Sequence, residues 1–151
     1  MNLDELHDNE VQGLISSLKN PSKIFGIQEI NAKISPMLGS LEVNEKIVGI
    51  ADEIEYILHI YRGNRDMNRY TINLRFASKH HQLIRIDIGS GHNNPDGTRI
   101  DGDHIHIYSR EYPKRDRVAY PLDSHEFPNV QNIIDAFSNF TLYTSIKENL
   151  G

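Results

Sequence analysis

The chain has 151 residues, 38% of them hydrophobic, and its 16 basic and 21 acidic side chains give a formal net charge of −5. This length predicts a single domain spanning residues 1–151, because one hydrophobic core usually serves roughly 100–200 residues. The acidic balance argues against a general electrostatic attraction to nucleic acid or to an anionic membrane. Cysteine is absent, which excludes disulfides, zinc–thiolate sites and thiol nucleophiles.

The N-terminal sequence, residues 1–5, is acidic where a signal peptide would be basic. No stretch of the chain approaches the ~20 apolar residues that are needed to cross a bilayer. We therefore expect a cytoplasmic protein that does not associate with a membrane.

Apolar residues recur at helical spacing near both ends of the chain. Residues 4–18 predict one helix, which Asn20-Pro21 ends because proline disfavours a helical residue before it. Residues 129–147 predict a second helix on the same spacing. Residues 22–45 are ambiguous, and we expect a short helix or an irregular connection there, with a strand near residues 41–43.

The middle of the chain changes to the two-residue period of strands. Alternating apolar and polar residues, rich in β-branched and aromatic types, predict strands over residues 53–61, 70–76, 82–88, 104–108 and 117–120. The polar segment 89–97 contains a Pro-Asp-Gly turn and predicts a loop. This order predicts an α+β fold, in which an antiparallel sheet of about four to five strands is flanked by an N-terminal and a C-terminal helix.

The segment around His104-Ile105-His106-Ile107-Tyr108 concentrates the chemistry of the chain. If it is extended, His104, His106 and Tyr108 project from one face, while Ile105 and Ile107 project from the other. Such a pair of imidazoles can act as general acid and base around a phosphodiester, so we take these three polar residues as candidate catalytic residues. A hydrogen-bonding strand surface without catalytic function is the more common role of this pattern.

The same imidazoles are spaced so that they could also converge on a metal ion. His92 or an aspartate of the adjoining loop, Asp101 or Asp103, would supply a third ligand, and our candidate set is His92, His104, His106 and Asp103. Neutral imidazoles favour zinc, nickel, copper or iron over magnesium. No cofactor is otherwise indicated, and this divalent transition metal is the alternative.

Further polar side chains could bind a partner or a phosphate group. The candidate binding residues are His92, Asp96, Arg99, Arg110, Arg115 and Arg117. The basic cluster at residues 110–117 alternates with acidic residues, which favours a solvated hairpin over a nucleic-acid surface. A second basic cluster comprises Arg62, Arg65 and Arg69, and the two would form one basic patch if they lay at the same end of the sheet.

Residues 92–108, together with Arg110-Glu111 and Ala119-Tyr120-Pro121-Leu122, resemble a family of small, uncharacterised bacterial proteins often carried on phages and other mobile elements. The resemblance is specific over residues 92–122 and looser over residues 54–140. Members usually have Lys-Trp before Ala-Tyr-Pro-Leu, whereas this chain has Arg117-Val118. The family has no established activity, and the resemblance implies an accessory protein that inhibits or modulates a host system.

Two function classes follow from these observations. The first is a non-enzymatic binding protein, similar to anti-CRISPR proteins, that inhibits a host protein or nucleoprotein complex targeting nucleic acid. An acidic surface could occupy a basic channel that normally holds nucleic acid. The second is a His-dependent or metal-dependent RNase or phosphodiesterase, in the manner of a toxin, built on His104 and His106 with Tyr108 or Arg99 assisting. No residue pattern sets the oligomeric state.

Overall fold

The computed structural model describes residues 1–23, 26–36 and 39–147 of the chain. The helices are α1 (Asp8–Ser16), α2 (Gly26–Ile34) and α3 (Ile133–Tyr143). The strands are β1 (Lys19–Pro21), β2 (Leu41–Gly49), β3 (Glu55–Arg62), β4 (Tyr70–Phe76), β5 (Gln82–Ile88), β6 (His92–Asn93), β7 (Arg99–Ile100), β8 (His104–Ile107) and β9 (Ala119–Pro121). Among the described helices, none has the length and apolar character to span a bilayer.

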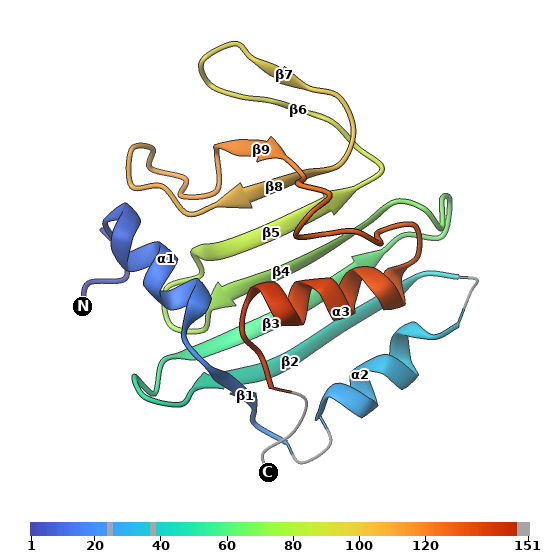
Figure 1. The fold of residues 1–151 in the computed structure, drawn as a ribbon, viewed down its shortest axis with the longest axis horizontal. Helices are drawn as coiled ribbons and strands as arrows, with labels where there is room; N and C mark the ends of the chain where they lie inside the picture. The colour runs from blue at the N-terminus through green and yellow to red at the C-terminus, as the bar shows by residue number, and fades with distance from the viewer. Residues whose placement is uncertain (24–25, 37–38, 148–151) are drawn as a thin grey trace.

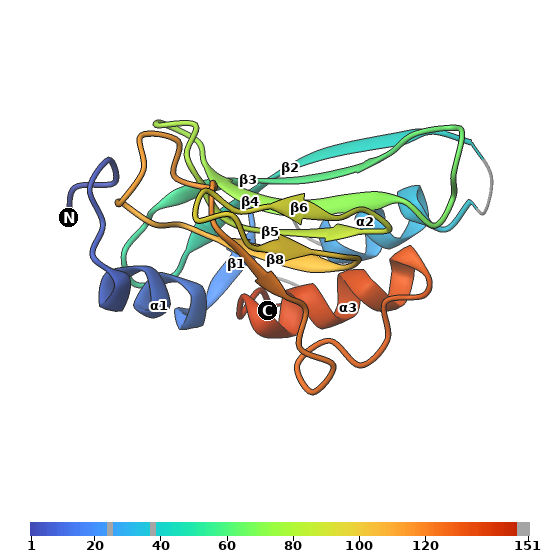
Figure 2. The same cartoon turned by 90° about the horizontal axis from the view of Figure 1, so that it is seen from above.

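Seven strands form one sheet in the order β1-β2-β3-β4-β5-β8-β9, and β6 pairs with β7 in a separate hairpin (Figure 1). Each neighbouring pair of these strands is antiparallel. The three helices lie on one side of the sheet, as Figure 2 shows most clearly for α1 and α3. The fold is therefore two-layered, with a helical side and an open side.

The core lies between the helices and one face of the sheet. Alternate residues of the central strands point into it, such as Leu58 on β3, Leu74 on β4 and Ile84 on β5, all fully buried. They are aligned across the strands by the register, which pairs Leu58 with Leu74 and Leu74 with Ile84. Phe137 and Phe140 of α3 close the core from the helical side.

A buried lysine joins the C-terminal ends of two helices. The ammonium of Lys19 lies within hydrogen-bond distance of the carbonyls of Leu14 (2.6 Å), Ile15 (3.1 Å), Ser17 (2.7 Å) and Thr144 (2.7 Å), among which its three N–H groups are shared. The last carbonyls of a helix have no partner within the helix, so a cation is a favourable donor to them. Lys19 therefore fixes the end of α1 beside the residue that follows α3.

The predicted α+β class with flanking helices is confirmed, although the sheet is larger than predicted. The strands predicted at 70–76 and 82–88 have those bounds as β4 and β5. The strand predicted near 41–43 extends to Gly49, and β1 was not predicted. Within the ambiguous segment 22–45 the structure forms α2, and residues 24–25 and 37–38 of that segment lie outside the described residues.

Both terminal helices are shorter than predicted. The predicted helix 4–18 is α1, which begins after the N-cap His7, and the residue after it, Ser17, is extended. The predicted helix 129–147 is α3, which begins after Asn132, whose side chain accepts a hydrogen bond from the backbone N–H of Asp135 (2.9 Å). Capping side chains, rather than the apolar period, therefore define where these helices begin.

Candidate metal centre

The open face of the sheet presents polar side chains from β5 and β8. The register pairs Asp87 with His104 and Arg85 with His106. Because side chains alternate along a strand, these four share the face opposite to the core residue Ile86. His104 and His106 are nevertheless each only 1% exposed.

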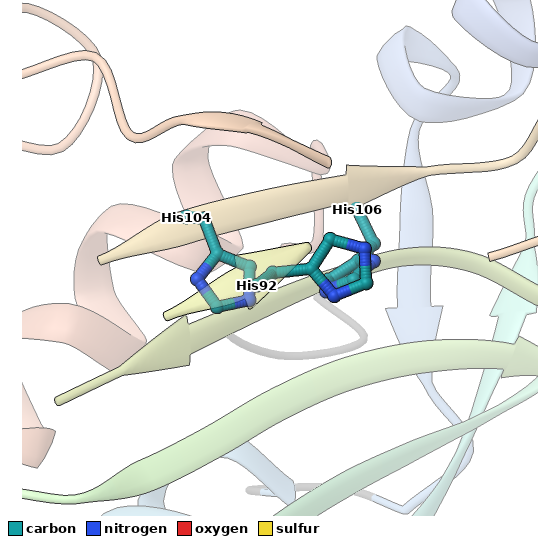
Figure 3. Close-up of side chains that lie close together, drawn as sticks. All are labelled: His92, His104 and His106. Carbon is teal, nitrogen blue, oxygen red and sulfur yellow. The ribbon is translucent and has the colours of Figure 1, made fainter. Parts of the chain in front are cut away.

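The β6–β7 hairpin brings a third imidazole to this face. The ring centroid of His92 lies 4.6 Å from that of His106 and 5.6 Å from that of His104, and the latter two lie 4.9 Å apart. One ring nitrogen of each of the three histidines lies within 4.8 Å of those of the other two. Figure 3 shows the three rings gathered at one point between β5, β6 and β8. The three histidines of the candidate metal set therefore lie together.

Each of the three rings also contacts a backbone carbonyl through its other nitrogen. His104 Nδ1 lies 2.9 Å from the oxygen of Gly102, His106 Nδ1 lies 2.7 Å from that of Asp116, and His92 Nε2 lies 2.9 Å from that of Arg117. A carbonyl oxygen can only accept, so these nitrogens carry the protons. In the neutral rings, the lone pairs are therefore on His104 Nε2, His106 Nε2 and His92 Nδ1. Metal-binding histidines are oriented in the same manner.

Asp87 faces two of these lone-pair nitrogens. Its Oδ2 lies 3.1 Å from Nε2 of His104 and 3.3 Å from Nε2 of His106. With a neutral His104, a carboxylate oxygen and a nitrogen lone pair would face each other, which is repulsive. A proton or a metal ion between the two atoms removes this repulsion, so the arrangement calls for a cation at this point.

Two of the separations between these donor atoms match those around a metal ion. Bonds of about 2.0–2.1 Å to imidazole nitrogen and carboxylate oxygen give a tetrahedral edge of about 3.3 Å. The two distances from Asp87 to the imidazole nitrogens are close to that value. The three imidazoles form a donor set suited to zinc, nickel, copper or iron, and Asp87, which lies beside two of them but outside the group of mutually close donor atoms, would be a fourth ligand.

Protonation of the groups favours coordination. Burial raises the pKa of Asp87, but its contact with the imidazole of His106 and the positive charge of Arg85 outweigh burial and hold the pKa below its usual value. Burial lowers the pKa of His92 below that of an exposed imidazole and outweighs the hydrogen bond to the Arg117 carbonyl, which raises the pKa; the positive charge of Arg85 adds to the lowering. Metal ligands must be deprotonated, and an ionised Asp87 and a neutral His92 meet that requirement.

Arg85 occupies part of the same site. Its Nη2 donates to Nε2 of His106 (2.8 Å), and its Nε forms an ion pair with Oδ1 of Asp87 (2.9 Å). Its Nη1 forms an ion pair with Asp116 (2.7 Å), which fixes the guanidinium to the loop after β8. Coordination by His106 therefore requires that Arg85 give up one hydrogen bond.

The prediction that Tyr108 shares a face with the two imidazoles is wrong. β8 ends at Ile107, and Tyr108 is 2% exposed in the hydrophobic core. Its ring packs edge-on against Phe76 at 6.3 Å between centroids, and its hydroxyl donates to the carbonyl of Leu3 (2.8 Å) and accepts from the N–H of Leu6 (3.2 Å). Tyr108 anchors the N-terminal segment and lies apart from the histidine cluster.

The predicted aspartates lie outside the cluster of donor atoms. Asp103 accepts from the N–H of Gly89 (2.8 Å), where it braces the loop after β5, and it does not belong to the group that could hold a metal. Asp96 accepts from the N–H and hydroxyl of Thr98 in the turn of the β6–β7 hairpin. Asp101 pairs with Arg99 at 3.1 Å on the exposed side of β7, so neither residue reaches the imidazoles.

The two basic clusters lie at opposite ends of the sheet, so they do not form one patch (Figure 1). Arg62 is buried and donates to backbone carbonyls of Pro36 and Gly39. Arg115 donates to the carbonyls of Asp4, Arg110 and Tyr112 and therefore holds its own loop in place. Arg110 and Arg117 are exposed, and Arg117 contributes only its carbonyl to His92.

Asp87 and Arg85 were missed as site residues. Their signal lies in the pattern Ile84-Arg85-Ile86-Asp87-Ile88, which places both polar residues on the face opposite to three buried isoleucines. A strand with that pattern, next to a His-x-His strand, puts its charges beside the imidazoles. The order of strands in the sheet was needed to draw this conclusion.

Comparison with known proteins gives one match. The model of the family described as "Family of unknown function (DUF6978)" matches residues 6–146. The searches of curated proteins and of solved structures gave no match.

Proposed function

We propose a metal-dependent hydrolase for this chain, which belongs to DUF6978, a family of unknown function. His92, His104, His106 and Asp87 would hold one divalent transition-metal ion. The observation that supports this proposal is the orientation of the imidazoles: each N–H contacts a backbone carbonyl, and the remaining nitrogens gather beside a carboxylate. The same observation argues against metal-free acid–base catalysis, because the N–H groups are already engaged and two of the rings are buried.

Hydrolysis is supported by where the cluster lies. Asp87 also lines an open groove of about 610 Å³, so an ion bound beside it would be next to a space that can take a substrate. A bound divalent ion can lower the pKa of a coordinated water to about 7 and polarise a phosphoryl or carbonyl oxygen. Zinc in catalytic sites can expand its coordination to admit such a water. A phosphodiester is the substrate class that the sequence suggests.

Metal binding is tested on protein purified without a histidine tag and dialysed against a chelator. Titration with Co²⁺ should give one equivalent bound, with the absorption of tetrahedral cobalt, and Zn²⁺ should displace it. Replacing His92→Ala or Asp87→Asn should weaken binding, whereas His59→Asn should not. His59 is the matched control, because it lies on the open face and contacts Glu42 and Asn73. Binding that is absent, or equal in all variants, would overturn the metal site.

Activity is tested separately, with bis(4-nitrophenyl) phosphate, 4-nitrophenyl phosphate and a 4-nitrophenyl ester as probes. We expect turnover of the phosphodiester by the metal-loaded protein, its loss in His104→Ala, and its retention in His59→Asn. Metal binding without turnover of any of the three probes would refute the hydrolase and leave a structural ion that fastens the hairpin to the sheet.

That outcome would favour the first function class predicted from the sequence. In it, the chain is an accessory protein of a phage or other mobile element that inhibits a host nucleoprotein complex. We propose a cytoplasmic location for either function, since a chain without cysteine suits a reducing compartment. Retention of a host complex on the immobilised protein, with loss of that complex's nuclease activity, is the measurement for this alternative.

A further inference from the structure

A groove opens beside the histidine cluster, at the end of the sheet where β3 turns into β4. Its volume is about 610 Å³, and its lining includes Tyr61, Arg65, Arg69, Thr71, Asp87 and Ser90. This volume lies within the range of ligand sites, about 300–1,000 Å³. Asp87 is shared between the groove and the candidate metal centre.

Two cations of the groove are available to an anion. Arg65 and Arg69 are exposed, and the ion pairs and side-chain hydrogen bonds formed among the described residues do not engage their guanidinium groups. Of the acidic lining residues, Asp66 accepts from the N–H of Asn68 (2.9 Å), and Asp87 forms an ion pair with Arg85, which offsets part of its charge. Guanidinium groups bind phosphate through paired hydrogen bonds, so the two arginines suit a phosphate group.

The register places an aromatic ring in line with the candidate metal centre. It pairs Tyr61 with Thr71, Thr71 with Asp87, and Asp87 with His104 across four adjacent strands. Neighbouring strands are about 4.8 Å apart, so Tyr61 and Asp87 lie about 10 Å from each other on this row. Tyr61 is 47% exposed, and exposed aromatic rings are surfaces on which nucleobases stack.

We propose that this groove binds a nucleoside phosphate, either free or as part of a single-stranded nucleic acid. The base stacks on Tyr61, the phosphate is held by Arg65 and Arg69, and the phosphorus faces Asp87 and the metal centre. As a substrate site this inference rests on the proposed hydrolase, whereas the binding itself depends only on the groove. A local site of this kind agrees with the net charge of −5, because it needs no basic surface beyond the two arginines.

The test measures binding by calorimetry with three probes: inorganic phosphate, AMP and a six-residue oligoadenylate. We expect AMP to bind, and the double variant Arg65→Gln/Arg69→Gln to weaken it by about tenfold or more. Tyr61→Ala should weaken AMP and leave inorganic phosphate unchanged, since phosphate makes no stacking contact. Arg75→Gln, an arginine on β4 outside the groove that contacts His80, is the matched control and should bind as the native protein does.

The probes distinguish the sources of the ligand. Tighter binding of the oligoadenylate than of AMP, with a steeper dependence on salt, identifies a single-stranded nucleic acid, and equal binding identifies a mononucleotide. Binding should persist in His104→Ala, which separates this proposal from the metal centre. Absence of binding by AMP and the oligoadenylate, or equal binding in the groove variants and the native protein, overturns it.

Discussion

Replacing Arg85→Gln should tighten metal binding. The guanidinium donates to the nitrogen of His106 that would coordinate the ion, at 2.8 Å, and is paired with Asp87 at 2.9 Å. It therefore competes with the ion for one imidazole and one carboxylate. Glutamine removes the positive charge and shortens the side chain, so both ligands become available.

The size of the effect follows from two contributions. The ion would use the lone pair of His106 Nε2 that now accepts from the guanidinium, so Arg85 must move away; at a separation of about 5 Å, the repulsion between a divalent ion and one positive charge is about 1.7 kcal/mol even in water. The hydrogen bond that must break adds about 1 kcal/mol. A gain of about 2–3 kcal/mol corresponds to an affinity about 30- to 150-fold higher.

The assay is competition for Zn²⁺ with a chromophoric chelator at constant pH. Arg75→Gln is the control, because Arg75 lies on the neighbouring strand β4 and contacts His80 rather than the cluster. Arg85→Lys should give little gain, because it keeps the charge. A folded Arg85→Gln protein, verified by its circular dichroism and melting temperature, whose zinc affinity equals or falls below the native value would refute coordination through His106.

Three further predictions concern the framework around the site. Lys19→Met should lower the free energy of unfolding by about 3 kcal/mol and the melting temperature by about 6–12 °C, because it leaves four carbonyls without their donor. A fall in the melting temperature of less than about 2 °C would contradict the role of Lys19 in joining the two helix ends. Burial lowers the pKa of Lys19 from 10.5 to about 8, so the unfolded chain binds more protons between these values. The difference in the free energy of unfolding between the native protein and Lys19→Met, measured by urea denaturation, should therefore increase from pH 8 to pH 10.5. A difference that does not change with pH would show that the carbonyls keep the ammonium charged. Tyr108→Phe should lower the free energy of unfolding by about 1–2 kcal/mol and leave zinc affinity unchanged, since the hydroxyl contacts only Leu3 and Leu6; an altered zinc affinity would place it at the site after all.

The alternation of residues was sufficient where one face of a strand is consistently apolar. β4 and β5 were predicted with their observed bounds because Ile72, Leu74, Ile84 and Ile86 all face the core. β2 was predicted too short, because a glutamate, Glu45, stands where the pattern requires an apolar residue between Val43 and Ile47. Glu45 is buried beside two lysines, at 3.1 Å from Lys33 and 3.7 Å from Lys23. Such a compensated charge cannot be recognised before the packing of α2 on β2 is known.

The histidine cluster could be predicted from the sequence only in part. Two imidazoles of one strand share a face as a matter of strand geometry, and His92 is close in sequence. The failure at Tyr108 has the same origin, because alternation holds only as far as the strand is extended, and β8 ends at Ile107. Asp87 and Arg85 depend on β5 pairing with β8, a long-range choice that no local pattern encodes.

Asp87 connects the two proposals physically. Its Oδ2 faces the imidazole nitrogens, its Oδ1 faces Arg85, and the residue lines the groove that holds Arg65 and Arg69. An ion bound at the cluster would take up the negative charge that Asp87 otherwise presents to an incoming phosphate. The groove should consequently bind an anion more tightly in the metal-loaded protein than in the metal-free one, and the anion should in turn tighten the metal by the same factor, because coupling between two sites is reciprocal. If the cluster binds an ion but the groove binds no phosphate beside it, this coupling between the two affinities is absent.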